Sequence, residues 1–172
     1  ELDSDYIETL IARVTACAQG AWTSRSPARL RFGVGHCDIA VSRRKPDGKG
    51  GVMWKPAPEV SHDHDVPVLK IESPQGDLRG VIFSYACHPT SRGGTSIGGD
   101  YVCFAYDHID HSYPEITSCF LQGCGGDQKT KPVDPASATF VPREIHEIRN
   151  IGVELGSSVV QVLQSDVLHD VT

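Results

Sequence analysis

The sequence has 172 residues, of which 39% are hydrophobic and 22% are charged. A chain of this size can bury one ordinary core without disulfides, so we expect one domain. The net charge of -6 argues against a nucleic-acid surface, which needs clustered Lys and Arg, and Arg43-Arg44-Lys45 is interpreted as a short solvated cluster. No apolar run approaches the ~20 residues that span a bilayer, and no signal-peptide core is recognised before the first expected helix.

The first third of the chain predicts a helix followed by strands. Apolar residues recur at helical spacing at Ile7, Leu10, Ile11, Val14 and Ala18. Asp5 and Glu8 have the spacing of a capping box, so we expect a surface helix that packs by one face and ends near Gly20. Alternation at Leu30, Phe32 and Val34 predicts a half-buried strand, and a second strand is expected over 37–41. The Pro- and Gly-rich segment 43–58 is interpreted as a loop.

The rest of the chain predicts a sheet with helices against it. Segment 66–71 and the apolar segment 81–87 are expected to pair as a hairpin around a turn at 73–77, and 81–87 to be a central strand. A helix with Asp100 as its N-cap follows, then a short buried strand over 116–121. The last helix is expected to begin at Pro142, with its buried face at Ile145, Ile148, Leu155, Val159, Val162 and Leu163.

This order of elements favours a layered α/β domain with a mostly buried mixed sheet covered by helices. The residues expected in its central sheet are Leu69, Ile71, Phe83, Tyr85, Phe120 and Leu121. The covering helices are expected to contain Ile109 and Leu155.

His88 directly follows the expected central strand. Open α/β sheets place ligands in the crevice beyond their strand ends, where the sheet holds side chains rigidly. This position favours a functional histidine. The alternative is a histidine that caps the strand and bonds to a neighbouring carbonyl.

Three motifs follow one another in the middle of the chain. They are Tyr85-Ala86-Cys87-His88-Pro89-Thr90, Ile97-Gly98-Gly99-Asp100-Tyr101 with Phe104-Ala105, and Phe120-Leu121-Gln122-Gly123-Cys124-Gly125-Gly126-Asp127, and Asp63-His64-Asp65-Val66-Pro67-Val68-Leu69 is a weaker fourth. In order and spacing the chain resembles, over residues 28–160, the neutral/alkaline non-lysosomal ceramidase family, especially its shorter bacterial members. The resemblance implies that His88 is a zinc ligand and that Gly126-Asp127 forms part of the active-site wall.

The candidate site is built on these motifs. Asp127 is the candidate catalytic residue, which would orient a ligand histidine or bind substrate, although a loop aspartate is otherwise most often a turn residue. Asp100 and Asp127 each follow a glycine pair next to strands expected to be neighbours, so both are expected near His88. The candidate substrate-binding residues are Thr90, Gly98, Gly99, Asp100 and Gly126. The glycine run allows close backbone approach to a ligand, or it forms a tight turn that needs positive φ.

Lys129 departs from the family pattern. The ceramidases that define the family carry a serine nucleophile two residues after the aspartate, and Lys129 stands at that place. Cleavage through a serine is therefore in doubt, whereas a zinc-activated water remains available. Nothing in the polar run around Lys129 is expected to depress its pKa, so we assign it no nucleophilic role.

Other candidates have weaker patterns. His62 and His64, two apart, are able to chelate one ion if they lie on one face of a strand, but the resemblance assigns no ligand there. His108 and His111 share a helical face and are expected to be solvated. The six cysteines are expected to be reduced and mostly buried, and Cys119 and Cys124 lack a second pair for a zinc site. Cys87 and His88 point to opposite faces of a strand, which disfavours a cysteine hydrolase.

Two functions follow. The first is a zinc-dependent hydrolase that cleaves an amide in a lipid-like N-acyl substrate, and the second is a binding or regulatory module that has lost the nucleophile. The missing initiator methionine and the resemblance suggest a fragment, with further zinc ligands outside residues 1–172, so we expect the chain alone to hold zinc weakly and to leave ceramide intact. Family resemblance suggests an extracellular or periplasmic location, and the oligomeric state is not indicated.

Overall fold

Two sheets and three helices make up the part of the chain that the computed structural model describes, residues 3–171. The helices are α1 (Ser4–Thr23), α2 (Asp100–Ser112) and α3 (Ile145–Gln164). The larger sheet has the strand order β6 (Thr117–Gln122), β5 (Leu78–Tyr85), β4 (Asp65–Glu72), β1 (Arg29–His36) and β8 (His169–Asp170). The smaller sheet has the order β3 (Val52–Ala57), β2 (Ala40–Pro46) and β7 (Gln128–Thr130).

Strand β5 lies inside the larger sheet, between β4 and β6. It pairs antiparallel with β4, which confirms the expected hairpin, and parallel with β6. The sheet is therefore mixed, as predicted. The strand ends at Tyr85, two residues earlier than expected, and the chain bends at Cys87 before the His88 backbone pairs with that of Lys129.

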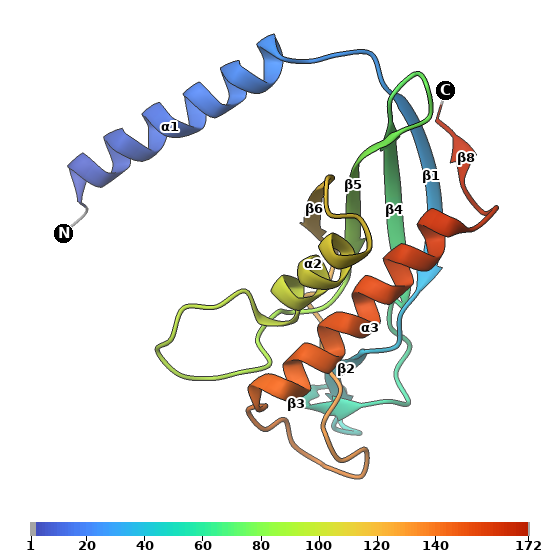
Figure 1. The fold of residues 1–172 in the computed structure, drawn as a ribbon. Coiled ribbons are helices and arrows are strands. Elements are labelled where there is room, and N and C mark those ends of the chain that lie inside the picture. The colour runs from blue at the N-terminus through green and yellow to red at the C-terminus, as the bar shows by residue number, and fades with distance from the viewer. Residues whose placement is uncertain (1–2, 172) are drawn as a thin grey trace.

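Helices α2 and α3 pack against each other and cover one face of the larger sheet (Figure 1). Val68, Val81, Phe83 and Tyr85 project into this layer and are almost completely buried. They meet the buried face of the helices, which includes Tyr101, Ala105, Ile109, Leu155 and Val159. The layered α/β architecture predicted from the sequence is thus confirmed.

Strand β1 buries the opposite side from the one predicted. Gly33 is buried and Gly35 half-buried, because α3 crosses close above them and a Cβ on Gly35 would lie 2.7 Å from Val162. Leu30 and Val34 are on the other face, where their side chains are 37% and 43% exposed. The expectation that the apolar residues of this strand face the core is wrong, because close helix packing requires the small residues there.

Helix α1 stands away from the rest of the molecule (Figure 1). It begins after Asp3, whose carboxylate accepts a hydrogen bond from the Tyr6 amide at 3.0 Å, rather than at the predicted capping box. It runs through Gly20 to Thr23, and none of its described residues is buried. The predicted helix exists, but its packing by one face is not observed.

Other boundaries also differ from the predictions. The segment expected as a loop over 43–58 contains most of the β2–β3 hairpin, and β2 extends well beyond the predicted 37–41. Strand β6 is at the edge of the sheet and is not buried. Helix α2 has Gly99 as its N-cap instead of Asp100. Helix α3 begins at Ile145, which is exposed, behind a capping box formed by Glu144 and Glu147.

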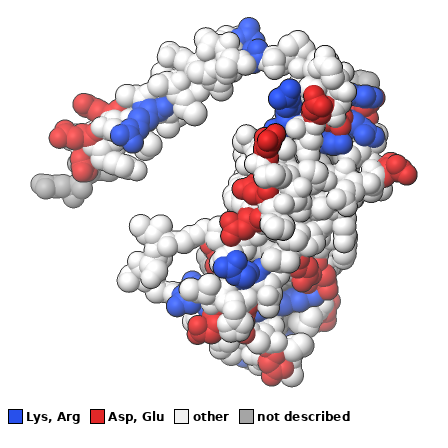
Figure 2. All heavy atoms as spheres, in the orientation of Figure 1, with Lys and Arg blue, Asp and Glu red and all other residues white. Residues whose placement is uncertain are grey.

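Charge is mixed over the surface. Figure 2 shows both acidic and basic side chains on the visible face of the body, whereas residues 14–23, the second half of α1, carry no charge. Among residues 3–171, no helix is both long and apolar enough to cross a membrane.

Gly152 allows α3 to approach α2, and this contact gives a test of the packing. A Cβ at this position would lie 2.5 Å from Phe104 Cβ and would also clash with the Tyr101 carbonyl. We expect Gly152→Ala to lower the free energy of unfolding by about 1–3 kcal/mol, because overpacked cores must shift backbone.

The matched control is Gly20→Ala in α1, where a Cβ meets nothing within 4 Å. It should raise helix stability by up to about 1 kcal/mol, since alanine has the higher helix propensity. Urea denaturation of both variants measures the difference. Equal effects in the two helices would contradict the close α2–α3 contact.

Candidate active site

His88 is fixed by the backbone of the glycine loop, residues 123–126. Its Nδ1 lies 2.6 Å from the Gly125 carbonyl oxygen, and its own amide donates to the Gln128 carbonyl at 3.2 Å. A carbonyl only accepts hydrogen bonds, so Nδ1 carries the ring hydrogen and Nε2 keeps its lone pair. The structure therefore presents Nε2 of His88 as an acceptor or ligand atom.

Arg43 meets this free nitrogen. Its Nη2 is 3.3 Å from His88 Nε2 and also donates to the Gly126 carbonyl at 2.9 Å, while its Nε donates to the same oxygen at 3.2 Å. From the sequence, Arg43 is expected in a solvated cluster, and this expectation is wrong. No local signal was available, because the contact depends on the pairing of β2 with β7, which brings together residues 45 apart.

The glycine loop is shaped by close approach to the end of β5. A Cβ on Gly125 would lie 2.6 Å from the Cys87 amide nitrogen, and one on Gly123 3.0 Å from the Tyr85 carbonyl carbon. Neither glycine has positive φ, so close approach explains the run here rather than a turn of that type. The amides of Gly123 and Gly125 bond to backbone carbonyls, which leaves them unavailable to an oxyanion.

Lys129 lies buried beside His88, and the backbones of the two residues pair locally in the parallel sense. Its Nζ donates to the Thr90 carbonyl and, at 2.9 Å, to Thr90 Oγ1. Burial lowers the pKa of Lys129, and the nearby Arg43 and Arg143 add to this effect. The expectation that nothing depresses this pKa is wrong, because strand β7 carries the residue inside.

Asp100 and Asp127 have different surroundings. The Asp100 carboxylate accepts bonds from the Ser91 amide and hydroxyl, both at 2.7 Å, and from the Tyr101 amide at 2.8 Å. It thereby ties the segment after His88 to the start of α2, and its own φ is 51°. Asp127 is half-buried, and its carbonyl accepts from the Arg43 amide at 2.7 Å.

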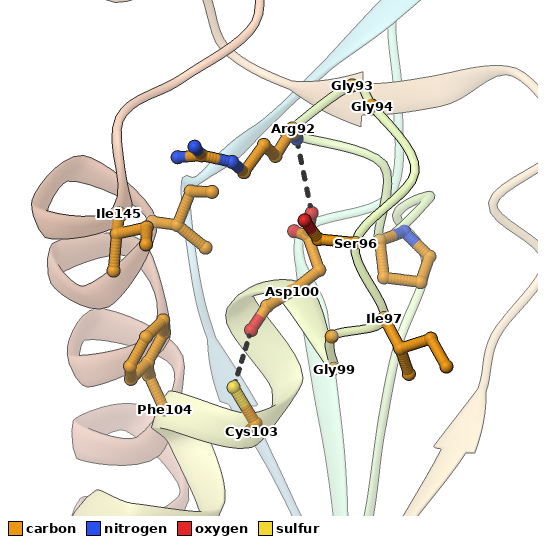
Figure 3. Close-up of a pocket in the computed structure, with 13 residues that line it drawn as sticks. Arg92, Gly93, Gly94, Ser96, Ile97, Gly99, Asp100, Cys103, Phe104 and Ile145 are labelled. Carbon is orange, nitrogen blue, oxygen red and sulfur yellow. Dashed lines mark hydrogen bonds between the residues drawn. The ribbon is translucent and has the colours of Figure 1, made fainter.

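A cavity of about 300 Å³ opens next to this region (Figure 3). Gly98, Gly99 and Asp100 line it, and Pro89 connects it to His88 along the chain. Its other walls come from the 92–97 loop and from α2 and α3, and they include Arg92, Cys103, Phe104, Ile145 and Ile148. The predicted residues thus fall into two neighbouring sets: His88, Thr90, Gly126 and Asp127 around Arg43 and Lys129, and Gly98 to Asp100 around the cavity.

The cysteines among residues 3–171 are free, as expected, but only Cys37 and Cys87 are buried. Burial raises the pKa of Cys87 to about 12 and that of Cys37 to about 11. Both are therefore protonated thiols near neutral pH, which disfavours Cys87 as a nucleophile. Cys119 and Cys124 are exposed.

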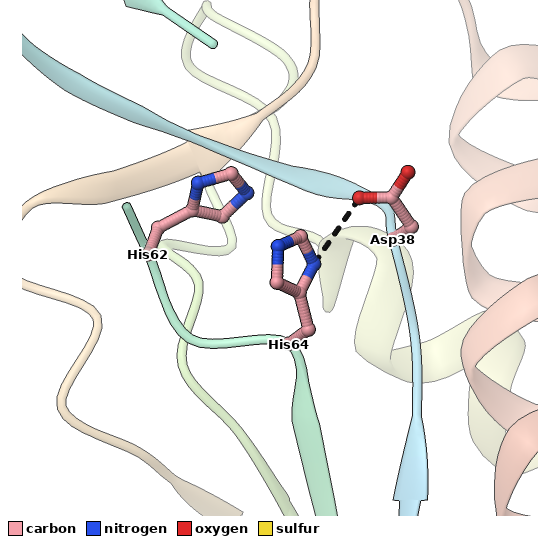
Figure 4. Close-up of side chains that lie close together, drawn as sticks. All are labelled: Asp38, His62 and His64. Atoms are coloured by element: carbon pink, nitrogen blue, oxygen red, sulfur yellow. Dashed lines mark ion pairs between the residues drawn. The ribbon is translucent and has the colours of Figure 1, made fainter. Parts of the chain in front are cut away.

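A second set of ligand-type residues lies where β1 passes into β2. Asp38, His62 and His64 each offer one atom that is able to bind a metal ion, and these atoms lie within 4.8 Å of one another (Figure 4). The described part of the chain therefore contains one group of three residues that is able to hold a metal ion. The Lys131 ammonium also bonds to Asp38 and holds the pKa of that carboxyl below its usual range.

The lowered pKa of Lys129 predicts a pH dependence of stability. The folded state binds the Lys129 proton less tightly than the unfolded state, so the cost of burying the charge is present below the folded pKa and is relieved as pH rises toward the ordinary 10.5. As pH rises from the folded pKa of Lys129 to 10.5, we expect the free energy of unfolding of the wild type to increase relative to that of Lys129→Met. Urea denaturation of both chains at a series of pH values measures this difference, and a constant difference would contradict it.

Comparison with known proteins supports the fold. The sequence matches no protein-family model and no curated protein. Solved structures do match: neutral ceramidase from Pseudomonas aeruginosa (TM-score 0.65, 22% identity, 88% of this chain and 25% of that chain) and a ceramidase complexed with C2 (TM-score 0.62, 22% identity, 83% and 23%). The chain spans about a quarter of the length of these proteins. Its fold is that of a segment of neutral ceramidase, as the resemblance in the sequence implied.

Proposed function

We propose that this chain is the segment of a zinc-dependent hydrolase that cleaves an amide bond in a lipid-like N-acylated amine. The observation that carries the proposal is the orientation of His88, whose Nδ1 donates to the Gly125 carbonyl. Histidines that bind metals commonly donate their second ring nitrogen to a backbone carbonyl or a carboxylate. The similar solved structures are ceramidases, which supports the choice of an amide.

The donor chemistry at His88 fits zinc. A neutral imidazole with Nε2 free is a common zinc ligand, and Nε2 needs only to give up its contact with Arg43. When bound, zinc supplies a Lewis acid that polarises an amide carbonyl and activates water. The remaining ligands are proposed to lie outside residues 1–172.

Arg43 is proposed to stabilise the negative charge that develops on the amide oxygen. Its two bonds to the Gly126 carbonyl hold the guanidinium next to His88, so little reorganisation is needed when charge appears. Asp127, half-buried in the same turn, is proposed to orient the reacting groups.

The other candidate residues are proposed to form the substrate-binding wall. Thr90 and Gly126 border His88, while Gly98, Gly99 and Asp100 line the cavity. Phe104 and Ile148 give this cavity apolar surface suited to an acyl chain. Because the Lys129 amine is bonded to Thr90, hydrolysis is proposed to use water directly and not a covalent intermediate at position 129.

The role of His88 is tested in the full-length protein. We expect His88→Ala to lower zinc content and hydrolysis of a fluorescent N-acyl sphingosine together, by at least about 10-fold. The control is His111→Ala, an exposed histidine in the last turn of α2, which should change neither. Unchanged zinc and activity in His88→Ala would refute the proposal. Zinc that depends on His88 without any amide hydrolysis would favour a binding module instead.

Arg43 and Arg44 are adjacent in β2 and form a matched pair. Arg43 is half-buried against His88, whereas Arg44 is exposed. We expect Arg43→Met to lower kcat by about 10²–10³-fold, as the loss of one charge-stabilising donor does in other hydrolases. Arg44→Met should leave kcat unchanged. Steady-state kinetics on the same substrate measures both, and equal effects would remove the assigned role.

A further inference from the structure

The Asp38–His62–His64 group lies outside the contacts of the His88 site. Asp38 is in the short segment between β1 and β2, and the two histidines precede β4. In Figure 4 the rings of His62 and His64 lie next to each other, with centroids 4.2 Å apart, and Asp38 faces His64. The group therefore sits where the chain passes from the larger sheet to the smaller one.

Nδ1 of His64 is a polar atom whose hydrogen-bonding capacity is unsatisfied. This nitrogen is buried and has no hydrogen-bond partner, although Asp38 Oδ1 is only 3.1 Å away, within the ion-pair distance that Figure 4 marks. The distance suits a hydrogen bond, so the misalignment of the two groups prevents it. Two ligands of one tetrahedral zinc lie about 3.4 Å apart and are directed at the ion instead of at each other. A shared ion fits this arrangement better than a shared proton.

His62 has a related conflict. Its Nδ1 is 3.1 Å from the Val60 carbonyl oxygen and its Nε2 is 3.0 Å from the Ala40 carbonyl oxygen. A neutral imidazole carries one N–H, so one of these nitrogens directs its lone pair at an acceptor. A cation that takes up this lone pair removes the repulsion.

We propose that Asp38, His62 and His64 form a second metal site, which binds a divalent transition-metal ion of the zinc class. Two imidazoles and a carboxylate are ligands that such ions prefer, and three protein ligands leave a position for water. The ion would fasten segment 60–64 to segment 37–40 and so join the two sheets. Asp38 is exposed and the histidines are partly exposed, which gives ions in solution access.

This site changes the expectation for the chain by itself. From the sequence, residues 1–172 were expected to hold zinc weakly, because His88 is a single ligand. The Asp38–His62–His64 group supplies three ligands within these residues. Zinc binding by the isolated chain is therefore expected, independently of His88.

The test titrates the metal-free 172-residue chain with Zn²⁺ by calorimetry, and with Co²⁺ by the visible absorption of a tetrahedral complex. One ion per chain is expected. His62→Ala and His64→Gln should each weaken binding at least about 10-fold, because each removes a ligand. His111→Ala is the control and should bind as the wild type does. Circular dichroism of each variant checks that the fold is retained.

Two more variants test the charge around Asp38 and the independence of this site from His88. Lys131→Met removes the ammonium that competes for Asp38, so it should tighten zinc binding. His88→Ala should leave the affinity unchanged, which distinguishes this site from the one in the proposed function. Absence of binding by the wild-type chain would overturn the proposal, as would full affinity in a His62→Ala/His64→Gln double variant. An imidazolium signal from His62 by NMR at neutral pH, with no response to zinc, would show that a proton takes the place of the metal.

Discussion

The close contact between the glycine loop and the end of β5 is the constraint on which the rest of the His88 site depends. Gly125 lies so near the Cys87 backbone that no side chain fits between them. Because the two backbones touch, the Gly125 carbonyl reaches His88 Nδ1 and selects its tautomer. The same approach carries the Gly126 carbonyl to Arg43. A run of glycines thus sets the chemistry of a histidine and an arginine through main-chain oxygens, without any catalytic side chain of its own.

The predictable part of the fold was the part governed by periodicity and apolar runs. The central strand, its hairpin with β4, and the buried face of α3 from Ile148 onward were visible because burial repeats along one element. The burial of Lys129 and the position of Arg43 were not, since both depend on the pairing of β2 with β7 across a long stretch of sequence. For strand β1, the alternation of apolar residues predicts the wrong buried face, because α3 packs on its glycines, Gly33 and Gly35.

His88 and the Asp38–His62–His64 group differ in how their potential metal-ligating atoms are arranged. At His88, Nδ1 donates to a backbone carbonyl and Nε2 keeps its lone pair, but His88 does not belong to the group of three ligand-type residues found among residues 3–171. At Asp38, His62 and His64 three donors converge, yet their hydrogen bonds are imperfect. A single oriented histidine suits a metal site whose other ligands come from other segments. Three converging side chains with unsatisfied polar atoms suit a site that needs no further protein ligand.

The uncovered face of the larger sheet has a consequence for how this chain behaves in solution. Among residues 3–171, helices cover one side only, and Leu30, Val34 and Leu121 are among the exposed apolar side chains on the other. In the part of the chain that the structure describes, strand β6 also has no partner strand on its outer edge, and such edges readily pair with another chain. Apolar patches of this kind attract detergents, hydrophobic dyes and further copies of the same molecule. The chain should therefore self-associate less in dilute solution at low salt than in concentrated solution with sulfate, which strengthens apolar association.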